Sequence, residues 1–268
     1  MTRFDPYRVG RKFRLTDIDP ADTPFLKGSG EMQREQLDQL AQELDVLQNL
    51  LHAEGKRKVL LVLQGMDTSG KDGTVRWVFS RTSPLGVRVA AFKAPSAEEL
   101  AHDFLWRCHA VVPRAGELAV WNRSHYEDVL VPVVEGWIDK AEARRRYAQI
   151  NDFERLLAET GTVVVKCMLH ISPGEQRERL QARIDEPDKQ WKFSPDDLVV
   201  RKKWGAYQRA YEKALAATST AQAPWFVIPA DSKLHRNLMI ARLLVKTLRD
   251  MKSRAPSPDP ALKGLIVE

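Results

Sequence analysis

One stretch limits what this chain can fold into: an apolar run followed at once by a glycine-rich turn. Residues 59–63 read Val-Leu-Leu-Val-Leu, which is the pattern of a buried strand. Gly65, Gly70 and Lys71 follow in the spacing Gly-x-x-x-x-Gly-Lys, and an amphipathic segment begins near Lys71. The backbone N–H groups of such a turn point into one concavity, and the helix after it adds its positive N-terminal end. The stretch predicts a phosphate-binding loop, the alternative being an ordinary strand-to-helix turn.

Two acidic residues depart from the usual form of this loop. Asp72 stands directly after the lysine, where a Ser or Thr hydroxyl usually meets magnesium, and the nearest hydroxyl is Thr74. Asp67 lies inside the loop, where a carboxylate would repel phosphate unless a cation lay between them. Asp67 is therefore a candidate metal ligand or base, or else a turn-forming residue that bonds its own backbone. The residues expected to surround the phosphate are Gly65, Met66, Asp67, Thr68, Ser69, Gly70, Lys71, Asp72, Gly73 and Thr74.

Composition narrows the class of protein. The 268 residues are 43% hydrophobic and 29% charged, which is ordinary for a soluble globular enzyme. The net charge of +6 favours an anionic partner, and the basic runs 144–146 and 201–203 are either solvated helix faces or part of a channel for a polyanion. No run is apolar enough for a membrane span or a signal peptide, and Cys108 and Cys167 form no metal or redox motif. We expect a cytoplasmic protein with reduced cysteines and no membrane or nucleic-acid partner.

Strand and helix patterns alternate along the chain. Alternation of this kind predicts a three-layer α/β/α fold with about five parallel strands, whose ligands bind outside the carboxyl ends of the strands. The strands are expected at residues 58–63, 87–92, 118–121, 162–169 and 225–228, with helices that include 31–53, 140–159 and 173–185. We expect an N-terminal arm over 1–30, a main domain over 31–252 with a helical lid at about 174–205, and a tail over 253–268.

Polar residues follow the third predicted strand. Arg123 is expected at the strand end, where it either faces phosphates or forms a structural ion pair. Asp128 is a candidate metal ligand together with Asp67, because metal ions bridge phosphate oxygens in phosphoryl transfer, while the role of Glu127 stays open. His125 and Tyr126 are expected to pack and form hydrogen bonds.

The segment after the fourth strand predicts the lid. Arg179 and Arg183 are four residues apart and share one helix face, and Lys192 follows beyond the break at Glu186-Pro187. Inward basic residues on a closing lid would exclude water from the transfer, although a solvated arginine face is the alternative. Trp191 is expected to anchor the lid in the core rather than to stack on a base.

These motifs together resemble the second family of polyphosphate kinases, which transfer phosphate between polyphosphate and nucleotides. The resemblance covers nearly the whole chain, and its most specific part is an Asp-bearing loop followed by Asn-Arg-Ser at 122–124. The segments that carry it are 65–73, Phe-Lys-Ala-Pro at 92–95, 121–130, Trp-Lys-Phe-Ser-Pro at 191–195 and 225–231.

The resemblance implies a P-loop kinase fold, reversible transfer of the terminal phosphate of polyphosphate to ADP or AMP, and Mg²⁺, with Mn²⁺ as an alternative. Asp67 and Asp128 would hold metal or orient the acceptor, and His-Tyr-Glu-Asp at 125–128 is similar to the subgroup that uses both mono- and diphosphates, with Glu127 involved in that choice. It also implies adenine, or guanine, nucleotides and a homo-oligomer, either dimer or tetramer. The catalytic residues would be Asp67, Lys71, Arg123, Asp128 and Arg183, and further binding residues Lys93, Asn122, Glu127, Arg179 and Lys192.

Two other functions compete with this interpretation. An ATP-dependent kinase of a nucleoside monophosphate or another small molecule would share the loop and the lid but would not depend on polyphosphate. A basic nucleic-acid-binding module would bind DNA or RNA with steep salt dependence. The basic residues are not interleaved with aromatics, and no groove-reading motif is present, which argues against a nucleic-acid-binding module.

Overall fold

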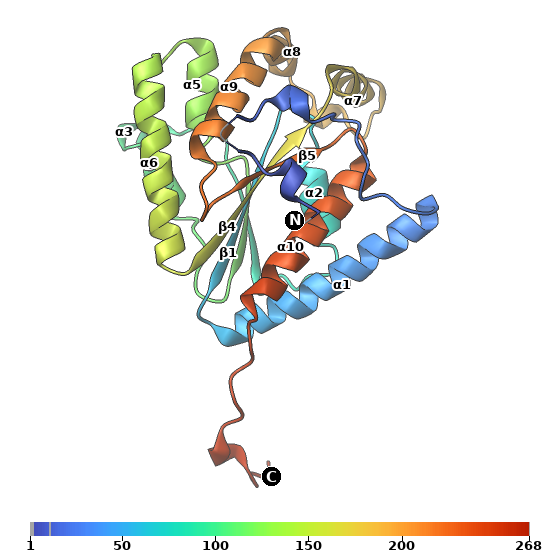
Figure 1. The fold of residues 1–268 in the computed structure, drawn as a ribbon, viewed down its shortest axis with the longest axis vertical. Coiled ribbons are helices and arrows are strands. Elements are labelled where there is room, and N and C mark those ends of the chain that lie inside the picture. The colour runs from blue at the N-terminus through green and yellow to red at the C-terminus, as the bar shows by residue number, and fades with distance from the viewer. Residues whose placement is uncertain (1–2, 11, 268) are drawn as a thin grey trace.

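The molecule is built around one parallel sheet (Figure 1). The computed structural model describes residues 3–10 and 12–267, so residues 1, 2 and 11 of the predicted arm and residue 268 of the predicted tail lie outside it. The strands are β1 (Lys58–Gln64), β2 (Val87–Ala91), β3 (Leu118–Asn122), β4 (Thr162–His170) and β5 (Trp225–Pro229), in the order β2-β3-β1-β4-β5. All four neighbouring pairs are parallel, which confirms the predicted α/β class and the five strands.

The central strands are apolar because both faces of the sheet are covered. Every residue of β1 after Lys58 is buried, and Val59 pairs with both Leu118 of β3 and Val163 of β4. Continuous apolar runs are what a strand buried on both faces requires. The predicted strand positions agree with the structure to within one residue at each end.

Helices form a layer on each face of the sheet (Figure 1). One layer comprises α1 (Gly30–Glu54), α2 (Lys71–Val78) and α10 (Lys233–Met251), and the other comprises α5 (Glu127–Glu135), α6 (Lys140–Glu159) and α9 (Trp204–Thr218). The short helices α3 (Ala97–Ala101) and α4 (Trp106–His109) connect β2 to β3. This is the predicted three-layer arrangement, and it leaves the carboxyl ends of the strands open to a ligand.

The region predicted as a lid lies beyond the carboxyl end of β4 (Figure 1). It comprises α7 (Pro173–Asp185), the 3₁₀ turn η3 (Gln190–Lys192) and α8 (Pro195–Lys202). Ser172 begins α7, where its hydroxyl accepts a hydrogen bond from the Glu175 amide. No residue of η3 or α8 is buried, so these elements rest on the surface of the domain.

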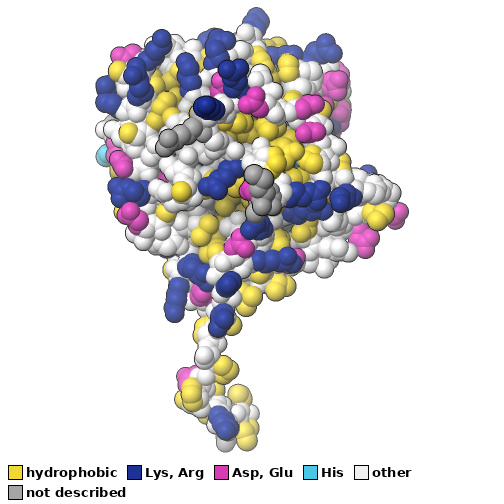
Figure 2. Space-filling view, in the orientation of Figure 1, with side chains coloured by type: hydrophobic (Ala, Val, Ile, Leu, Met, Phe, Trp, Pro, Cys, Tyr) yellow, Lys and Arg dark blue, Asp and Glu magenta, His cyan; other side chains and the backbone are white. Residues whose placement is uncertain are grey.

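The two ends of the chain differ in how they meet the domain. The N-terminal segment contains the 3₁₀ turns η1 (Asp5–Tyr7) and η2 (Leu15–Asp17), and its apolar side chains Phe4, Tyr7, Leu15 and Phe25 are buried. The segment after α10 leaves the body and ends in the 3₁₀ turn η4 (Pro260–Leu262) with apolar side chains exposed (Figure 2). Figure 2 also shows Lys and Arg side chains spread over the folded body with acidic side chains among them. Within the described residues, no helix is both long enough and apolar enough to cross a membrane.

Candidate active site

The glycine-rich turn joins β1 to α2 and is held in a conformation that glycine makes accessible. Gly65 has φ +154° and Gly70 has φ +100°. A Cβ on Gly65 would come within 2.7 Å of the Leu169 carbonyl oxygen, so no larger residue fits there without displacing β4. Gly70 precedes the first residue of α2, and its carbonyl accepts the Thr74 amide at 2.8 Å. The loop and the positive end of α2 therefore face the same space.

Lys71 folds back over this loop. Its Nζ donates to the Gly65 carbonyl at 2.7 Å and to the Met66 carbonyl at 3.2 Å. Burial lowers the pKa of Lys71, and the neighbouring Arg123 charge lowers it further, while Asp67 and other acids act against this. Among the described residues, its hydrogen bonds go to carbonyl oxygens and the nearby acids act on it through their charges alone, so an anion in the loop would add a direct partner.

Three hydroxyl groups of the loop and α2 are buried without a hydrogen-bond partner among the described residues. They belong to Thr68, Ser69 and Thr74. Buried polar groups in proteins are nearly always paired, so an unpaired group needs an explanation. Of the three residues, Thr68 lines the cavity, where phosphate oxygens would lie, whereas Ser69 and Thr74 lie in or behind the loop.

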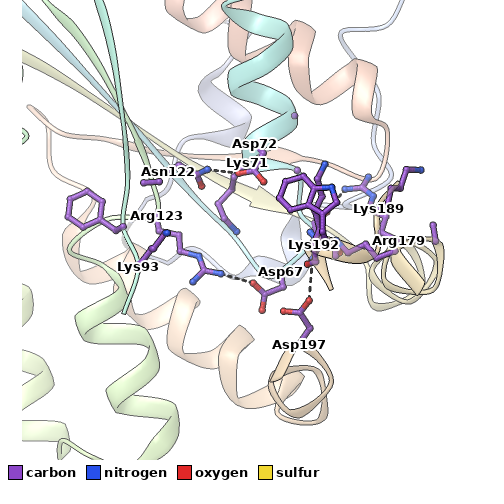
Figure 3. A pocket seen from close by; sticks show the side chains of 18 of the residues that line it. Asp67, Lys71, Asp72, Lys93, Asn122, Arg123, Arg179, Lys189, Lys192 and Asp197 are labelled. Atoms are coloured by element: carbon purple, nitrogen blue, oxygen red, sulfur yellow. Dashed lines mark hydrogen bonds and ion pairs between the residues drawn. The ribbon is translucent and has the colours of Figure 1, made fainter. Parts of the chain in front are cut away.

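The end of β3 forms the second wall of the site. Asn122 donates to the Asp72 carboxylate at 2.5 Å, which ties β3 to the first turn of α2. Arg123 donates to Asp67 at 2.9 Å and has φ +61°, a left-handed conformation that is uncommon for a residue other than glycine (Figure 3). The acids Glu127 and Asp67 outweigh the burial of Arg123 and raise its pKa, so the guanidinium stays charged.

Lid residues close the third side. Arg183 donates to Asp197 of α8 at 3.1 Å and to the Lys192 carbonyl at 3.0 Å. Burial raises the pKa of Asp197, and the Asp67 carboxylate raises it further, which indicates that the two acids lie near each other. Figure 3 shows Asp67 and Asp197 on the same side of the cavity, with Lys192 and Lys189 above them.

Arg179 joins the lid to the loop and to the sheet. Its guanidinium donates to the Glu175 carboxylate at 2.6 Å and to the Thr68 carbonyl at 2.9 Å. It also donates to the carbonyls of Ala230 and Asp231, at 2.8 and 2.7 Å. Most of its N–H groups are therefore used within the protein, and the geometry favours an anchoring role over direct contact with a transferring phosphate.

These walls enclose a cavity of about 630 Å³ at the carboxyl ends of the strands. Twelve of the sequence-predicted site residues line it: Asp67, Thr68, Gly70, Lys71, Asp72, Gly73, Lys93, Asn122, Arg123, Arg179, Arg183 and Lys192. Gly65, Met66, Ser69 and Thr74 lie in or just behind the loop without lining the cavity. The sequence reasoning missed Lys189, Asp197 and Lys233, which also line it. Lys233 follows β5, where the rule for open parallel sheets could have found it.

The structure places Asp128 apart from Asp67. The Asp128 carboxylate accepts a hydrogen bond from Arg107 at 2.9 Å, and neither residue lines the main cavity. Glu127 also lies outside the lining, close enough to Arg123 for their charges to interact. Within the described residues, no three His, Cys, Asp or Glu side chains gather as metal ligands. Asp67 lines the cavity and Asp128 does not, and a metal shared by the two stays a prediction.

Two predictions about aromatic residues have different outcomes. Trp191 is 78% exposed and lines the cavity, so the expectation that it anchors the lid in the core is wrong. Its ring lies 5.0 Å from the Lys192 ammonium. His125 and Tyr126 are buried and both contact Glu154, which confirms that they pack and form hydrogen bonds.

A glycine-rich phosphate loop at the end of a parallel sheet, faced by arginines and by a basic helical segment, defines a phosphotransferase of the P-loop kinase class. The model of the polyphosphate kinase 2 family matches residues 27–256. The chain belongs to the polyphosphate kinase 2 family and is an enzyme, which confirms the resemblance seen in its sequence.

Three similar proteins match this chain over more than nine-tenths of their own length. One from Meiothermus ruber, named AMP/ADP-polyphosphate phosphotransferase, is 49% identical over 264 residues, covering 98% of this chain and 99% of that protein. One from Rhodopseudomonas palustris, named ADP-polyphosphate phosphotransferase, is 42% identical, covering 98% and 95%. The crystal structure of polyphosphate kinase 2 from Arthrobacter aurescens TC1 has a TM-score of 0.92 and 45% identity, covering 96% of this chain and 93% of that one.

Proposed function

We propose that this enzyme transfers the terminal phosphate of inorganic polyphosphate to AMP and ADP in a reversible reaction. The observation that carries the proposal is the cavity itself, which places a phosphate loop opposite Arg123 and the basic lid residues Arg183, Lys189 and Lys192. A cavity with cations on several sides suits a chain of phosphates that continues past the reacting one. The relative from Meiothermus ruber is named for both AMP and ADP as acceptors, which supports the same pair here.

The basic side chains of the site have different roles in phosphoryl transfer. Catalysis of this reaction rests on positioning and on stabilising the charge of the migrating group. Lys71 and the loop amides hold one phosphate from below, and Arg123 approaches it from the end of β3. Arg183 reaches the cavity from α7 and stabilises charge on the lid side.

The acids Asp67 and Asp197 fit a divalent cation. Both line the cavity, and the pKa of Asp197 is raised by burial and, further, by the Asp67 carboxylate. Two carboxylates suffice for Mg²⁺, which keeps several waters and takes further oxygens from the substrate phosphates. We propose Mg²⁺, with Mn²⁺ as the alternative; such an ion, when bound, neutralises charge on the phosphates. Asp67 also orients Arg123 through their ion pair.

The segment 174–205 is proposed to act as a lid that moves between open and closed positions. Its elements η3 and α8 bury no residue, and Arg183 holds them together through Asp197 and the Lys192 carbonyl. Elements with few buried side chains open at low cost in free energy. Closure would exclude water, so that the phosphate passes to the nucleotide and is not hydrolysed.

Further properties are proposed from the same structure. The exposed Trp191 offers a flat face to the base of an adenine or guanine nucleotide. The edge strand β2 and the exposed apolar side chains Trp77, Leu85 and Val89 suit association into a homo-oligomer, either dimer or tetramer. The free, buried Cys108 and Cys167 suit a reducing, cytoplasmic location. The scattered positive charge gives no reason to expect a nucleic-acid partner.

The test is a transfer assay with polyphosphate and Mg²⁺, using ADP and AMP as separate acceptors. We expect ATP from ADP and ADP from AMP, and we expect both activities to fall at least ~10²-fold in Asp67→Asn and Lys71→Ala. Lys246→Ala, on the exposed side of α10, is the matched control and should behave as the wild type. Activity with one acceptor would overturn the dual specificity. Transfer from ATP to a small acceptor, without transfer from polyphosphate, would favour an ATP-dependent kinase.

A further inference from the structure

A second cation lies beneath the phosphate loop, outside the lining of the cavity. Arg236 belongs to α10 and is only 2% exposed. Its Nη1 donates to the Ser69 carbonyl at 3.2 Å, and its Nε and Nη2 donate to the Asn237 side-chain oxygen at 3.2 and 3.0 Å. The guanidinium therefore supports the loop from the side opposite to the cavity.

The loop is shaped to let this guanidinium approach. A Cβ on Gly70 would lie 1.8 Å from Nη1 of Arg236, and a Cβ on Gly73 would lie 3.2 Å from Nη2. Gly70 and Gly73 also line the cavity on their other side. The positive charge of Arg236 is thus separated from a bound phosphate only by the backbone of two glycines.

This charge has no acidic partner in the part of the chain that the structure describes. The hydrogen bonds of Arg236 go to a carbonyl and an amide, and none goes to a carboxylate. Burial lowers the pKa of Arg236 to about 9, and the positive charge of Arg179 acts in the same direction. An uncompensated buried guanidinium destabilises a fold, whereas a neutral donor could bond to the Ser69 carbonyl without that cost.

We propose that Arg236 is a positioning residue whose counter-charge is the phosphate bound in the loop. This proposal depends on the proposed function in one respect: that the loop binds a phosphate. Arg236 holds the Ser69 carbonyl so that the loop amides face the cavity, and its charge adds to that of Lys71 on the other side of the backbone. Binding of the anion and stability of the loop are therefore coupled: the filled loop compensates a charge that the empty loop leaves unbalanced.

Three variants separate this role from simple packing. Arg236→Met removes the charge and keeps an unbranched side chain, while Arg236→Lys keeps the charge. The matched control is Arg242→Met, on the same helix, where the guanidinium lies over the Phe25 ring and outside the site. The measurements are the affinity for inorganic tripolyphosphate by calorimetry and the melting temperature without ligand.

We expect Arg236→Met to bind tripolyphosphate about 10- to 100-fold more weakly, the size expected for losing one charge close to the anion. Its melting temperature without ligand should be equal to or above that of the wild type. Arg236→Lys should retain most of the affinity, and Arg242→Met should bind as the wild type does. An Arg236→Met variant that binds with unchanged affinity, or that fails to fold, overturns the proposal.

The calorimetric readout needs no phosphoryl transfer. If the wild type binds tripolyphosphate and Arg236→Met weakens that binding, the inference holds even where transfer assays point to a different donor. If transfer from polyphosphate proceeds normally in Arg236→Met with unchanged KM for polyphosphate, the proposed function holds and the inference is wrong.

Discussion

Buried positive charge occurs in two regions of this molecule. In the first region the charge is paired with a carboxylate, and in the second it bonds to neutral oxygens. On β4, Lys166 is fully buried and its Nζ lies 2.5 Å from the carboxylate of Glu154 on α6. Tyr126 donates to the same carboxylate at 2.8 Å, and Lys166 also donates to the Thr218 carbonyl. We call these residues, with His125, the balanced cluster, because its buried ammonium is paired directly with a carboxylate.

On the two sides of the phosphate loop, Lys71 and Arg236 are also buried, yet within the described residues their hydrogen bonds go to neutral oxygens. We call these two residues the loop floor. A buried charge without a partner is costly, so its retention calls for a reason outside the folding of the domain. We therefore expect the balanced cluster to hold the fold together and the loop floor to attract an anion at some cost in stability.

The largest effect should appear when the balanced cluster is broken. Lys166→Met leaves Glu154 as an unpaired buried carboxylate, and we expect the free energy of unfolding to fall by about 3–5 kcal/mol. Urea denaturation followed by circular dichroism measures this loss. Burial acts to raise the pKa of Glu154, but the Lys166 charge and the His125 hydrogen bond outweigh it and hold that pKa low.

A double variant sharpens the test of the balanced cluster. Lys166→Met combined with Glu154→Gln removes both charges, and we expect it to recover part of the lost stability. The same Lys→Met change in the loop floor, Lys71→Met, should leave stability unchanged or raised. Equal losses in Lys166→Met and Lys71→Met would show that the two regions do not differ in the way described.

Asp128 offers a smaller test, because it can be assigned to either region. Its ion pair with Arg107 at 2.9 Å makes it similar to Glu154, while the sequence predicted that it binds metal beside Asp67. If the ion pair is its role, Asp128→Asn should lower the free energy of unfolding by about 1–3 kcal/mol. The Mg²⁺ concentration needed for half-maximal activity should then stay within about twofold of the wild type, well under the tenfold or larger rise typical of losing a ligand or its support.

A matched comparison is Asp67→Asn. We expect it to raise the Mg²⁺ requirement and to leave the melting temperature close to that of the wild type. If Asp128→Asn instead raises the Mg²⁺ requirement as Asp67→Asn does, the metal assignment made from the sequence is right and the placement of Asp128 among the structural ion pairs is wrong.

The sequence predicted most of the fold because the signals are local. The strand of residues 58–64, the loop and the start of α2 are contiguous, so apolar patterning and glycine spacing locate them together. The ends of the other strands then bring Asn122 and Arg123 to the same edge of the sheet.

The rest of the site depends on packing between distant segments. Arg236 contacts Ser69, which is 167 residues away in the chain, and no local sequence pattern predicts that contact. Asp197 reaches the cavity only because α8 folds back over Arg183. The partner of Asp128 is Arg107, from the short helix α4. The sequence does not reveal this contact, so from the sequence Asp128 resembles an unpaired metal ligand. The exposure of Trp191 likewise depends on how the lid lies on the domain.

The smallest expected effect is a dependence of polyphosphate binding on alkaline pH. Burial lowers the pKa of Lys71 below its ordinary 10.5, with Arg123 acting in the same direction and Asp67 opposing it. In the window below 10.5 the unfolded chain therefore binds more protons than the empty native protein, so stability without ligand rises with pH there. A bound phosphate favours the charged ammonium, so affinity for polyphosphate should fall as pH rises through the same window.

We expect the KM for polyphosphate to rise several-fold between pH 8 and 10, with a limit of about tenfold per pH unit for each titrating group. Arg236, whose pKa burial and Arg179 lower to about 9, titrates in the same window. Lys71→Arg places a group of higher ordinary pKa at this position, so the contribution of residue 71 should move to higher pH. The pH dependence that then remains near pH 9 reports on Arg236. A KM that does not change with pH in the wild type would mean that neither cation of the loop floor loses its proton, and that the loop floor is better compensated than its contacts indicate. A rise that persists in full in Lys71→Arg and disappears in Arg236→Met would assign the effect to the guanidinium beneath the loop alone.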